Sequence, residues 1–456
     1  MGDYNNFLKN KKFTFENSGF DVDKNQLNTM LYDFQKDIGR WALKKGRACV
    51  FASCGLGKSP IQLTWAYHVQ KQIGGKILIV APLAVVEQTK RESEKFGYTI
   101  KICEKQNDCI EGINITNYEK LDKFIAIEFT GIVLDESSIL KSYSGKIRTD
   151  IINNFKSVPY KLACTATPAP NDYMELGNHS EFCGVMTRSE MLSMFFVHDG
   201  GDTSQWRLKG HAQDVFWKWL STFGVFIDNP KNIGYEMKEY DLPLLNVTEI
   251  IVDKVPLIKR NLTLLERRQA RKDSLELRCK HAAELVNNSD EQWLIWCDLN
   301  SESELLSKLI NESVEVKGSD TPEHKSKSML DFSNNKIKNL VTKPSIAGYG
   351  MNWQNCHNMI FTGLSDSFEQ YYQAVRRCYR FGQDKPVNVY IIISSKEGCV
   401  KDNIQRKEKD FLQMQSEMIN LTKEITKKEL QNTCRIDTPY EPNEEIKLPK
   451  WKEFIA

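Results

Sequence analysis

Short apolar runs alternate with longer amphipathic segments in the first third of the chain. The apolar runs end in polar, glycine or proline residues and lie at residues 50–59, 76–82, 113–118, 131–136 and 161–168. Segments of about 10–15 residues with helical spacing separate them. Because parallel strands need crossover helices of this kind, the pattern predicts an α/β domain. Its doubly wound parallel sheet would collect ligands at the carboxyl ends of the strands.

The second half of the chain shows the same alternation. Short apolar runs at residues 293–297, 339–342, 359–362 and 387–393 predict four strands of another parallel sheet. The pattern therefore predicts two α/β domains in tandem.

The region between the two predicted sheets, residues 175–290, has a different pattern. It fits neither sheet, and we interpret it as a mainly helical insertion. Aromatic and basic residues are interleaved there: Trp206, Phe216, Trp217, Trp219 and Phe223 with Arg207, Lys209, His211 and Lys218, then Lys259, Arg260, Arg267, Arg268, Arg271 and Lys272 in a helix candidate at 257–286. Two interpretations stay open: a nucleic-acid face, or a domain that packs its tryptophans internally.

Helical patterns flank both sheets. The first begins near Leu27 and has apolar residues at Leu31, Phe34, Ile38, Trp41 and Ala42. The last predicts helices that pack back on the core through Val400, Ile404, Phe411, Met414, Met418 and Leu421, before a polar tail from Asn432. The expected domains are a polar segment at 1–26, α/β domains at 27–175 and 291–395, the insertion at 176–290, and C-terminal helices at 396–456.

Composition narrows the setting. A chain of 456 residues suits two or three domains of about 150–200 residues each. The formal net charge is only +2, so nucleic-acid binding would need a local basic face. Twelve cysteines without a C-x-x-C pair argue against a zinc ribbon or a disulfide framework. With no apolar run of membrane-spanning length and no signal-like N-terminus, we expect a cytoplasmic protein without membrane contact.

A glycine-rich loop follows the first apolar run. Gly55 and Gly57 allow backbone N–H groups to point inward, where they and the next helix N-terminus can bind the phosphates of a nucleotide. Lys58 would reach those phosphates, and Ser59 would hold magnesium. Ala52 occupies the position where the full phosphate-loop pattern has glycine.

Two further sites carry candidate chemistry. The run at 131–136 delivers Asp135 and Glu136 together, so that one carboxylate can hold magnesium and the other can act as general base on the attacking water. Gln35 precedes the glycine-rich loop, and its amide can donate to and accept from the edge of an adenine. A solvated side chain is the simpler alternative for Gln35.

These motifs resemble those of the superfamily 2 helicases, which include the DEAD/DEAH-box proteins. Gln35, the loop at 52–59, Asp135-Glu-Ser-Ser138 and Thr165-Ala-Thr-Pro168 resemble the Q motif and motifs I, II and III. Residues 345–352 and 373–383 resemble motifs V and VI. The forms Asp135-Glu-x-x-x-x-Lys141, Thr167-Pro-x-x-Asn171 and Arg380-Phe-Gly-Gln383 are similar to the Swi/Snf-type branch of double-stranded DNA translocases.

The resemblance implies two RecA-like domains that close around ATP and magnesium. Arg377 and Arg380 would act as arginine fingers, although with Arg376 they could instead form a solvated helix face. The implied ATP-binding residues are Gln35, Gly55, Leu56, Gly57, Lys58, Ser59 and Gly350, with Ser59 and Asp135 as magnesium ligands. The implied nucleic-acid contacts are Pro82, Thr116, Asn117, Thr165, Thr167 and Asn352.

We therefore favour a nucleic-acid-stimulated ATPase that moves along duplex DNA. A strand-separating helicase acting on DNA or RNA is the first alternative, and an ATP-dependent clamp or scaffold on nucleic acid is the second. A metabolic phosphate-loop kinase is disfavoured, because the motif VI arginines and Thr165-Ala-Thr-Pro168 would have no role in it.

Overall fold

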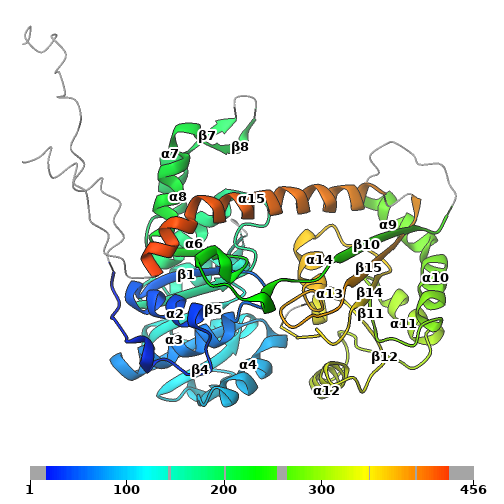
Figure 1. The fold of residues 1–456 in the computed structure, drawn as a ribbon, viewed down its shortest axis with the longest axis horizontal. Helices are drawn as coiled ribbons and strands as arrows, with labels where there is room; N and C mark the ends of the chain where they lie inside the picture. The colour runs from blue at the N-terminus through cyan, green and yellow to red at the C-terminus, as the bar shows by residue number, and fades with distance from the viewer. Residues whose placement is uncertain are drawn as a thin grey trace, which may run out of the picture.

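Two parallel sheets lie side by side in the computed structural model (Figure 1). The structure describes residues 17–141, 145–199, 202–253, 264–348, 350–395 and 398–430. Strands between residues 47 and 227 form the first sheet, and strands between 245 and 393 form the second. The predicted α/β class with two parallel-sheet domains in tandem is confirmed.

The first sheet has seven strands, and its central ones are buried on both faces. Uninterrupted apolar runs such as Ile77–Val80 suit this environment because helices cover a parallel sheet from both sides. The strand order is β3 (Ile100–Ile102), β4 (Gly112–Asn117), β2 (Lys76–Ala81), β5 (Phe129–Asp135), β6 (Tyr160–Thr165), β1 (Arg47–Ala52) and β9 (Gly224–Ile227). Its helices include α2 (Asp33–Lys45), α3 (Lys58–Ile73), α4 (Leu83–Lys95), α5 (Lys146–Asn154) and α6 (Leu176–Cys183).

The second sheet has six strands, and all four that the sequence predicted are present. The order is β10 (Leu245–Ile251), β15 (Val387–Ile393), β14 (Asn358–Phe361), β11 (Trp293–Trp296), β13 (Asn339–Thr342) and β12 (Ser313–Glu315). The helices of this domain are α9 (Leu264–Asp273), α10 (Leu275–Asn287), α11 (Asn300–Leu309), α12 (Pro322–Ser333), α13 (Pro344–Ala347) and α14 (Phe368–Val375).

The interpretation that residues 175–290 fit neither sheet is wrong. Strand β9 pairs in parallel with β1 at the edge of the first sheet, and β10 pairs in parallel with β15 at the edge of the second. Edge strands can be short or largely polar, because one side or one face stays in water. β9 has four residues and β10 is mostly exposed, so neither shows the long apolar run that marks a central strand.

The rest of this middle region packs against the first domain. It contains α7 (Arg188–Phe195), the hairpin β7 (Phe196–Asp199) with β8 (Asp202–Leu208), and α8 (Gln213–Ser221), which rise above the first sheet (Figure 1). Phe216, Trp217, Trp219 and Phe223 are buried, so internal packing is the correct interpretation for these four aromatic residues. Lys259 and Arg260 lie outside the described residues.

The N-terminal helix begins later than the sequence pattern indicates. Helix α2 starts at Asp33, whereas Leu27 and Leu31 are buried in a non-helical segment after a short 3-10 turn at Lys24–Gln26. Apolar residues four apart do not by themselves separate a helix from such a packed segment. Residues 1–16, the main part of the predicted polar segment, lie outside the described chain.

Among the described residues after 395, one long helix, α15 (Gly398–Leu430), is found where the sequence predicted several C-terminal helices. Five of the six apolar positions expected to pack on the core are buried: Val400, Ile404, Phe411, Met414 and Met418. The prediction for Leu421 is wrong, since 38% of this residue is exposed. A stripe through Ile404, Phe411 and Met418 continues at Thr422, which is buried in its place.

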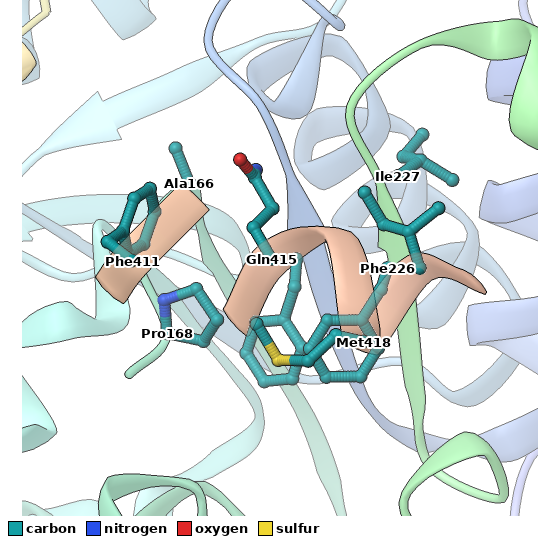
Figure 2. A pocket seen from close by; sticks show the side chains of 9 residues that line it. Ala166, Pro168, Phe226, Ile227, Phe411, Gln415 and Met418 are labelled. Atoms are coloured by element: carbon teal, nitrogen blue, oxygen red, sulfur yellow. The ribbon is translucent and has the colours of Figure 1, made fainter. Parts of the chain in front are cut away.

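Helix α15 joins the two domains. Phe411 packs its ring against Phe368 and Tyr372 of the second domain, at centroid distances of 5.3 and 5.2 Å. Figure 2 shows Phe411, Gln415 and Met418 beside first-domain residues, and together they line a small cavity with Ala166, Pro168, Phe226 and Ile227. Further along, Glu429 forms an ion pair with Lys45 of α2. The helix thus spans the domain interface on one side of the molecule.

Within the described residues, no helix combines the length and the apolar character needed to cross a lipid bilayer. The predicted polar tail from Asn432 lies beyond them.

Replacing Phe411 should weaken the link between the domains. Phe411 is 1% exposed, and Phe411→Ala leaves a cavity between α15 and α14, so we expect a loss of about 3–5 kcal/mol in the free energy of unfolding by chemical denaturation. The neighbouring Leu412 is 46% exposed, and Leu412→Ala should change stability by less than about 0.5 kcal/mol. Equal effects in the two variants would contradict the packing role of α15.

Candidate active site

The glycine-rich loop connects β1 to α3 with two left-handed residues. Gly55 has φ 92° and Gly57 has φ 78°, a conformation that disfavours any side chain. A Cβ atom on Gly57 would lie 2.2 Å from Nε2 of Gln35, so the loop is also closely approached. Lys58 begins α3 and its Nζ donates to the carbonyl oxygen of Ala52 at 2.9 Å. The loop therefore has left-handed glycines of the kind that build an anion-binding nest, and the Lys58 ammonium group is held against its first residue, Ala52.

Gln35 ties helix α2 to this loop. Its Oε1 accepts from the backbone N–H of Tyr32 at 3.0 Å, and its Nε2 donates to the carbonyl oxygen of Leu56 at 3.1 Å. The side chain is buried, so the alternative of a solvated glutamine is wrong. An adenine-binding role for Gln35 stays a prediction.

Asp135 and Glu136 end β5 in two different environments. Asp135 is buried, and its Oδ1 accepts from Nε2 of Gln62 at 2.7 Å. Burial, and then the charge of Glu136, raise the pKa of the Asp135 carboxyl to about 6. Glu136 is half-buried and its Oε2 accepts from Thr165 Oγ1 at 3.2 Å. The two carboxylates are thus placed separately, as two different roles would require.

The backbone at Glu136 is strained, and buried groups on both sides hold it. Its φ of 53° is unusual for a residue other than glycine and is found at functional sites. Before it, the Tyr118 hydroxyl donates to the carbonyl oxygen of Asp135 at 2.7 Å. After it, Ser137 Oγ and His179 Nε2 form a hydrogen bond of 3.1 Å. These contacts fix the direction of the Glu136 side chain.

Motif VI brings side chains of the second domain to the glycine-rich loop. Arg377 is buried, and its guanidinium donates to the carbonyl oxygen of Met351 at 3.1 Å and approaches Cys54 Sγ at 3.9 Å. Arg380 also donates to the carbonyl oxygen of Met351, at 3.3 Å. Burial and the charge of Arg377 lower the pKa of Arg380 to about 10. Phe381 lies against Gly55, so the domains meet at the loop itself.

The alternative in which all three arginines form one solvated face is wrong. Helix α14 ends at Val375, so the helical spacing does not continue through Arg380. The Arg376 guanidinium is not in open solvent but packs against two aromatic rings, 5.2 Å from the ring centroids of both Tyr372 and Tyr379. Arg377 and Arg380 remain at the domain interface.

The residues implied to contact nucleic acid lie in two kinds of place. Asn352 is exposed and Pro82 is half-exposed at the start of α4, so both are accessible. Thr116, Asn117, Thr165 and Thr167 are buried, and Thr165 and Thr167 donate to the carboxylates of Glu136 and Glu369. Gly350, implied to bind ATP, lies instead beside Val85 of α4, where a Cβ atom would come within 2.6 Å of that side chain. The roles of all these residues stay predictions.

Sequence reasoning missed several polar groups at this interface. Gln62 of α3 donates to Asp135, and Gln373 of α14 approaches Cys54, with 3.7 Å between Oε1 and Sγ. Glu92 of α4 adds a third carboxylate: burial raises its pKa, and a hydrogen bond from Ser59 opposes that rise. Gln373 was detectable as the first residue of motif VI. Gln62 and Glu92 lie mid-helix, where only the folded chain shows which way they face.

The buried His179 should make stability fall with acidity. Burial lowers its pKa from 6.5 to about 4, so the unfolded chain binds the extra proton more tightly over that range. The contribution of the neutral His179 to the free energy of unfolding is therefore fully present above pH 6.5 and is lost as pH falls towards 4. At about 1.4 kcal/mol for each pH unit of the shift, the loss amounts to about 3 kcal/mol. In chemical denaturation between pH 4 and 7, His179→Gln should show a correspondingly flatter pH dependence than the unmodified protein. The exposed His211 supplies the control variant His211→Gln, whose pH dependence should match that of the unmodified protein. If the stability of His179→Gln depended on pH as steeply as that of the unmodified protein, His179 would not be the group responsible.

Two family models match successive parts of the chain. The model described as type III restriction enzyme, res subunit, matches residues 20–170, and the helicase conserved C-terminal domain matches residues 277–382. The first match contains the glycine-rich loop, Asp135 and Glu136, and the second contains Arg377 and Arg380.

Individual relatives match less of the chain or at lower identity. The bifunctional helicase and thymine dioxygenase JBP2 of Leishmania braziliensis is 36% identical over 86 residues, which are 18% of this chain and 8% of that protein. JBP2 of Leishmania infantum gives the same identity and coverage. The solved structure of the Sulfolobus solfataricus SWI2/SNF2 ATPase core in complex with dsDNA has 17% identity and a TM-score of 0.43, covering 88% of this chain and 98% of that one.

The two family models match in the order in which the two parallel-sheet domains follow one another, and the motifs of both domains meet at one interface. On this evidence the chain belongs to the superfamily 2 helicase-like ATPases.

Proposed function

We propose that the chain is an ATP-dependent motor that moves along duplex DNA. The observation that carries the proposal is the contact between domains at the glycine-rich loop. Gln373 and Arg377 of the second domain both approach Cys54 of the first, so a change at the nucleotide acts on both domains at once. Two domains that open and close with each ATP can advance their separate grips on a nucleic acid.

The residues present fit ATP with magnesium. Two left-handed glycines and Lys58 surround the position of the phosphates, and Asp135 and Ser59 offer the oxygen ligands that magnesium prefers. Gln373 is fully buried, yet its Nε2 has no hydrogen-bond partner among the described residues. An orphan buried donor is costly unless a ligand pairs with it, and a phosphate oxygen would do so.

Each side chain can then be given a task. ATP supplies the phosphoanhydride bond, and magnesium offsets the phosphate charge. Lys58 and the loop N–H groups orient the phosphates, Asp135 holds the metal side, and Glu136 orients and deprotonates the attacking water. Arg377 and Arg380 approach from the other domain, where they would stabilise charge that develops during transfer. Hydrolysis therefore needs the closed interface.

Duplex tracking is favoured over strand separation by two features. The forms Asp135-Glu-x-x-x-x-Lys141 and Arg380-Phe-Gly-Gln383 resemble the double-stranded DNA translocases. The protruding hairpin β7–β8 would be a candidate wedge, but its Trp206 ring is half-buried and lies against the His198 ring, at a centroid distance of 3.7 Å and an interplanar angle of 40°. An aromatic ring engaged in this way is not free to enter between base pairs.

Two substitutions should separate binding from chemistry. Lys58→Ala should weaken ATP binding and abolish turnover, because it removes the ammonium group at the phosphates. Glu136→Gln should keep ATP affinity within about threefold while hydrolysis falls by about a hundredfold or more, because Asp135 survives as a metal ligand. Equilibrium binding of a fluorescent ATP analogue and steady-state phosphate release measure the two effects. Near-normal hydrolysis in Glu136→Gln would remove Glu136 from the role of general base.

The choice of nucleic acid distinguishes motor, helicase and clamp. Contacts to phosphates rather than bases predict that duplex DNA of any sequence stimulates the ATPase more than single strands do, and that binding weakens steeply with salt. Under ATP, a triplex-forming third strand should be displaced, while a forked duplex should open poorly. Trp206→Ala should leave triplex displacement unchanged if the hairpin is no wedge.

Other outcomes would replace this proposal. Efficient fork opening that is lost in Trp206→Ala, with an ATPase that prefers single strands, would establish a helicase with a hairpin wedge. Polymer-stimulated hydrolysis without displacement of any strand would establish a clamp. Stimulation by RNA alone would reject both DNA assignments.

A further inference from the structure

One buried carboxylate crosses from the second domain into the first. Glu369 lies in the first turn of α14, and only 5% of the residue is exposed. Lys141 Nζ of the first domain donates to its Oε2 in an ion pair. Thr167 Oγ1, also of the first domain, donates to its Oε1 at 3.4 Å. Both oxygens of this second-domain residue are therefore bound by the first domain.

The two partners of Glu369 belong to the segments that carry the candidate catalytic carboxylates. Lys141 ends the short 3-10 segment Ser137–Lys141, which directly follows Glu136. Asn178 Nδ2 donates to the carbonyl oxygen of Leu140 at 2.6 Å and keeps this segment in place. Thr167 lies two residues after Thr165, whose hydroxyl donates to Glu136. Glu369 is thus bonded to the two backbone segments that flank Glu136, so a displacement of Glu369 would also displace these segments.

On its own side, Glu369 is the first anchor of the helix that leads to the arginines. Gln373 lies one turn further along α14, where its Oε1 accepts from Arg377 Nη2 at 3.1 Å. Its carbonyl oxygen also accepts from Arg377 Nε at 3.0 Å. Helix α14 is therefore fixed to the first domain at its start by Glu369 and near its end by Gln373 and Arg377, which approach Cys54. Two separated anchors determine both the position and the rotation of a helix, whereas one leaves rotation free.

Electrostatics makes this contact conditional on domain closure. A carboxylate buried at an interface is stable only when paired, and its two donors come from the opposite domain. The Lys141 side chain is already 37% exposed, so separation of the domains mainly returns the Glu369 carboxylate to water, where the screened attraction between the two charges becomes weak. The pair therefore exists in the closed arrangement and favours that arrangement.

We infer that Glu369 is a positioning residue that couples domain closure to placement of Arg377 and Arg380 at the nucleotide. It acts through its bonds to Lys141 and Thr167, which lie beside Asp135 and Glu136; we call these bonds the clasp. Helix α14 and the turn after it then place Gln373 and the two arginines at the interface. This inference rests on the proposed ATP hydrolysis. It differs from a simple packing role because the clasp would affect turnover more than ATP binding or folding.

The test compares charge variants at the two ends of the clasp. Glu369→Gln keeps the shape and can still accept from Thr167, but it loses the charge that pairs with Lys141. We expect kcat at saturating ATP and duplex DNA to fall about tenfold or more, with KM for ATP changed by less than about threefold, because the arginines act in the transition state. Glu369→Lys and Lys141→Glu should each be more damaging, and the double exchange Lys141→Glu with Glu369→Lys should recover a large part of kcat.

A matched control uses an ion pair inside one domain. Lys76 and Glu128 form a surface pair with 2.9 Å between Nζ and Oε2, so Glu128→Gln should leave kcat and KM unchanged. Small-angle X-ray scattering of the ligand-free proteins gives a readout that does not depend on activity. Glu369→Gln should have a larger radius of gyration than the unmodified protein, and Glu128→Gln should not.

The outcomes separate this inference from the proposed function. If the unmodified protein shows no ATPase activity, the proposed function fails, and the scattering comparison still decides whether the clasp holds the domains together. Unchanged kcat in Glu369→Gln, with an active unmodified protein, would overturn the inference whatever the scattering shows. A third outcome would overturn the inference in favour of simple packing. In it, Glu369→Gln lowers both kcat and the melting temperature, and the double exchange restores neither.

Discussion

The meeting of two sets of polar side chains, one from each domain, at one interface is the constraint on which the rest of the structure depends. The first domain presents the loop after β1 and the carboxylates after β5, and the second presents the arginines that follow α14. Neither domain has the whole set, since Asp135 belongs to the first domain and Arg377 to the second. Two contacts keep the side chains of the two domains together. Phe411 of the long helix α15 packs on Phe368 of the second domain, and Phe381 lies against Gly55 of the first. A nucleotide between them would be bound by the whole molecule.

The central strands were predictable because burial on both faces demands an uninterrupted apolar run. Residues 76–82 and 131–136 show this plainly, and the predicted strands appear there as β2 and β5. The edge strands were not predictable, because one side of an edge strand is free of this demand. β10 has the residues Asn246, Thr248 and Glu249 among its apolar ones, and only its parallel pairing with β15 in the folded chain identifies it. The region between the sheets was misinterpreted for this reason.

The candidate site divides in the same way. Residues whose task requires a particular type at a particular spacing, such as Gly57 beside Lys58 or Asp135 beside Glu136, stand out in the sequence, and the structure places them at one interface. Residues that act through a tertiary contact have no such signal. Glu369, Gln62 and His179 lie in helices where carboxylates, amides and histidines are common, and their significance follows only from the partners that folding provides. Leu421 shows the converse, since its apolar character suggested a contact that the helix geometry does not allow.

Under the proposed function the interface opens with each ATP, and strength and reversibility then impose opposite demands on its contacts. Apolar contacts such as that of Phe411 with Tyr372 hold the domains at a fixed separation and change little with small displacements. An ion pair with one buried partner behaves differently, because its attraction is stronger in the closed arrangement and falls to about 1 kcal/mol once water surrounds both charges. In the pair of Glu369 with Lys141 the carboxylate is buried, while the lysine side chain is 37% exposed. The clasp of Glu369 with Lys141 thus favours full closure without resisting the later stages of opening. Because Lys141 and Thr167 belong to the segments that flank Glu136, this dependence on closure would act at the proposed reaction site.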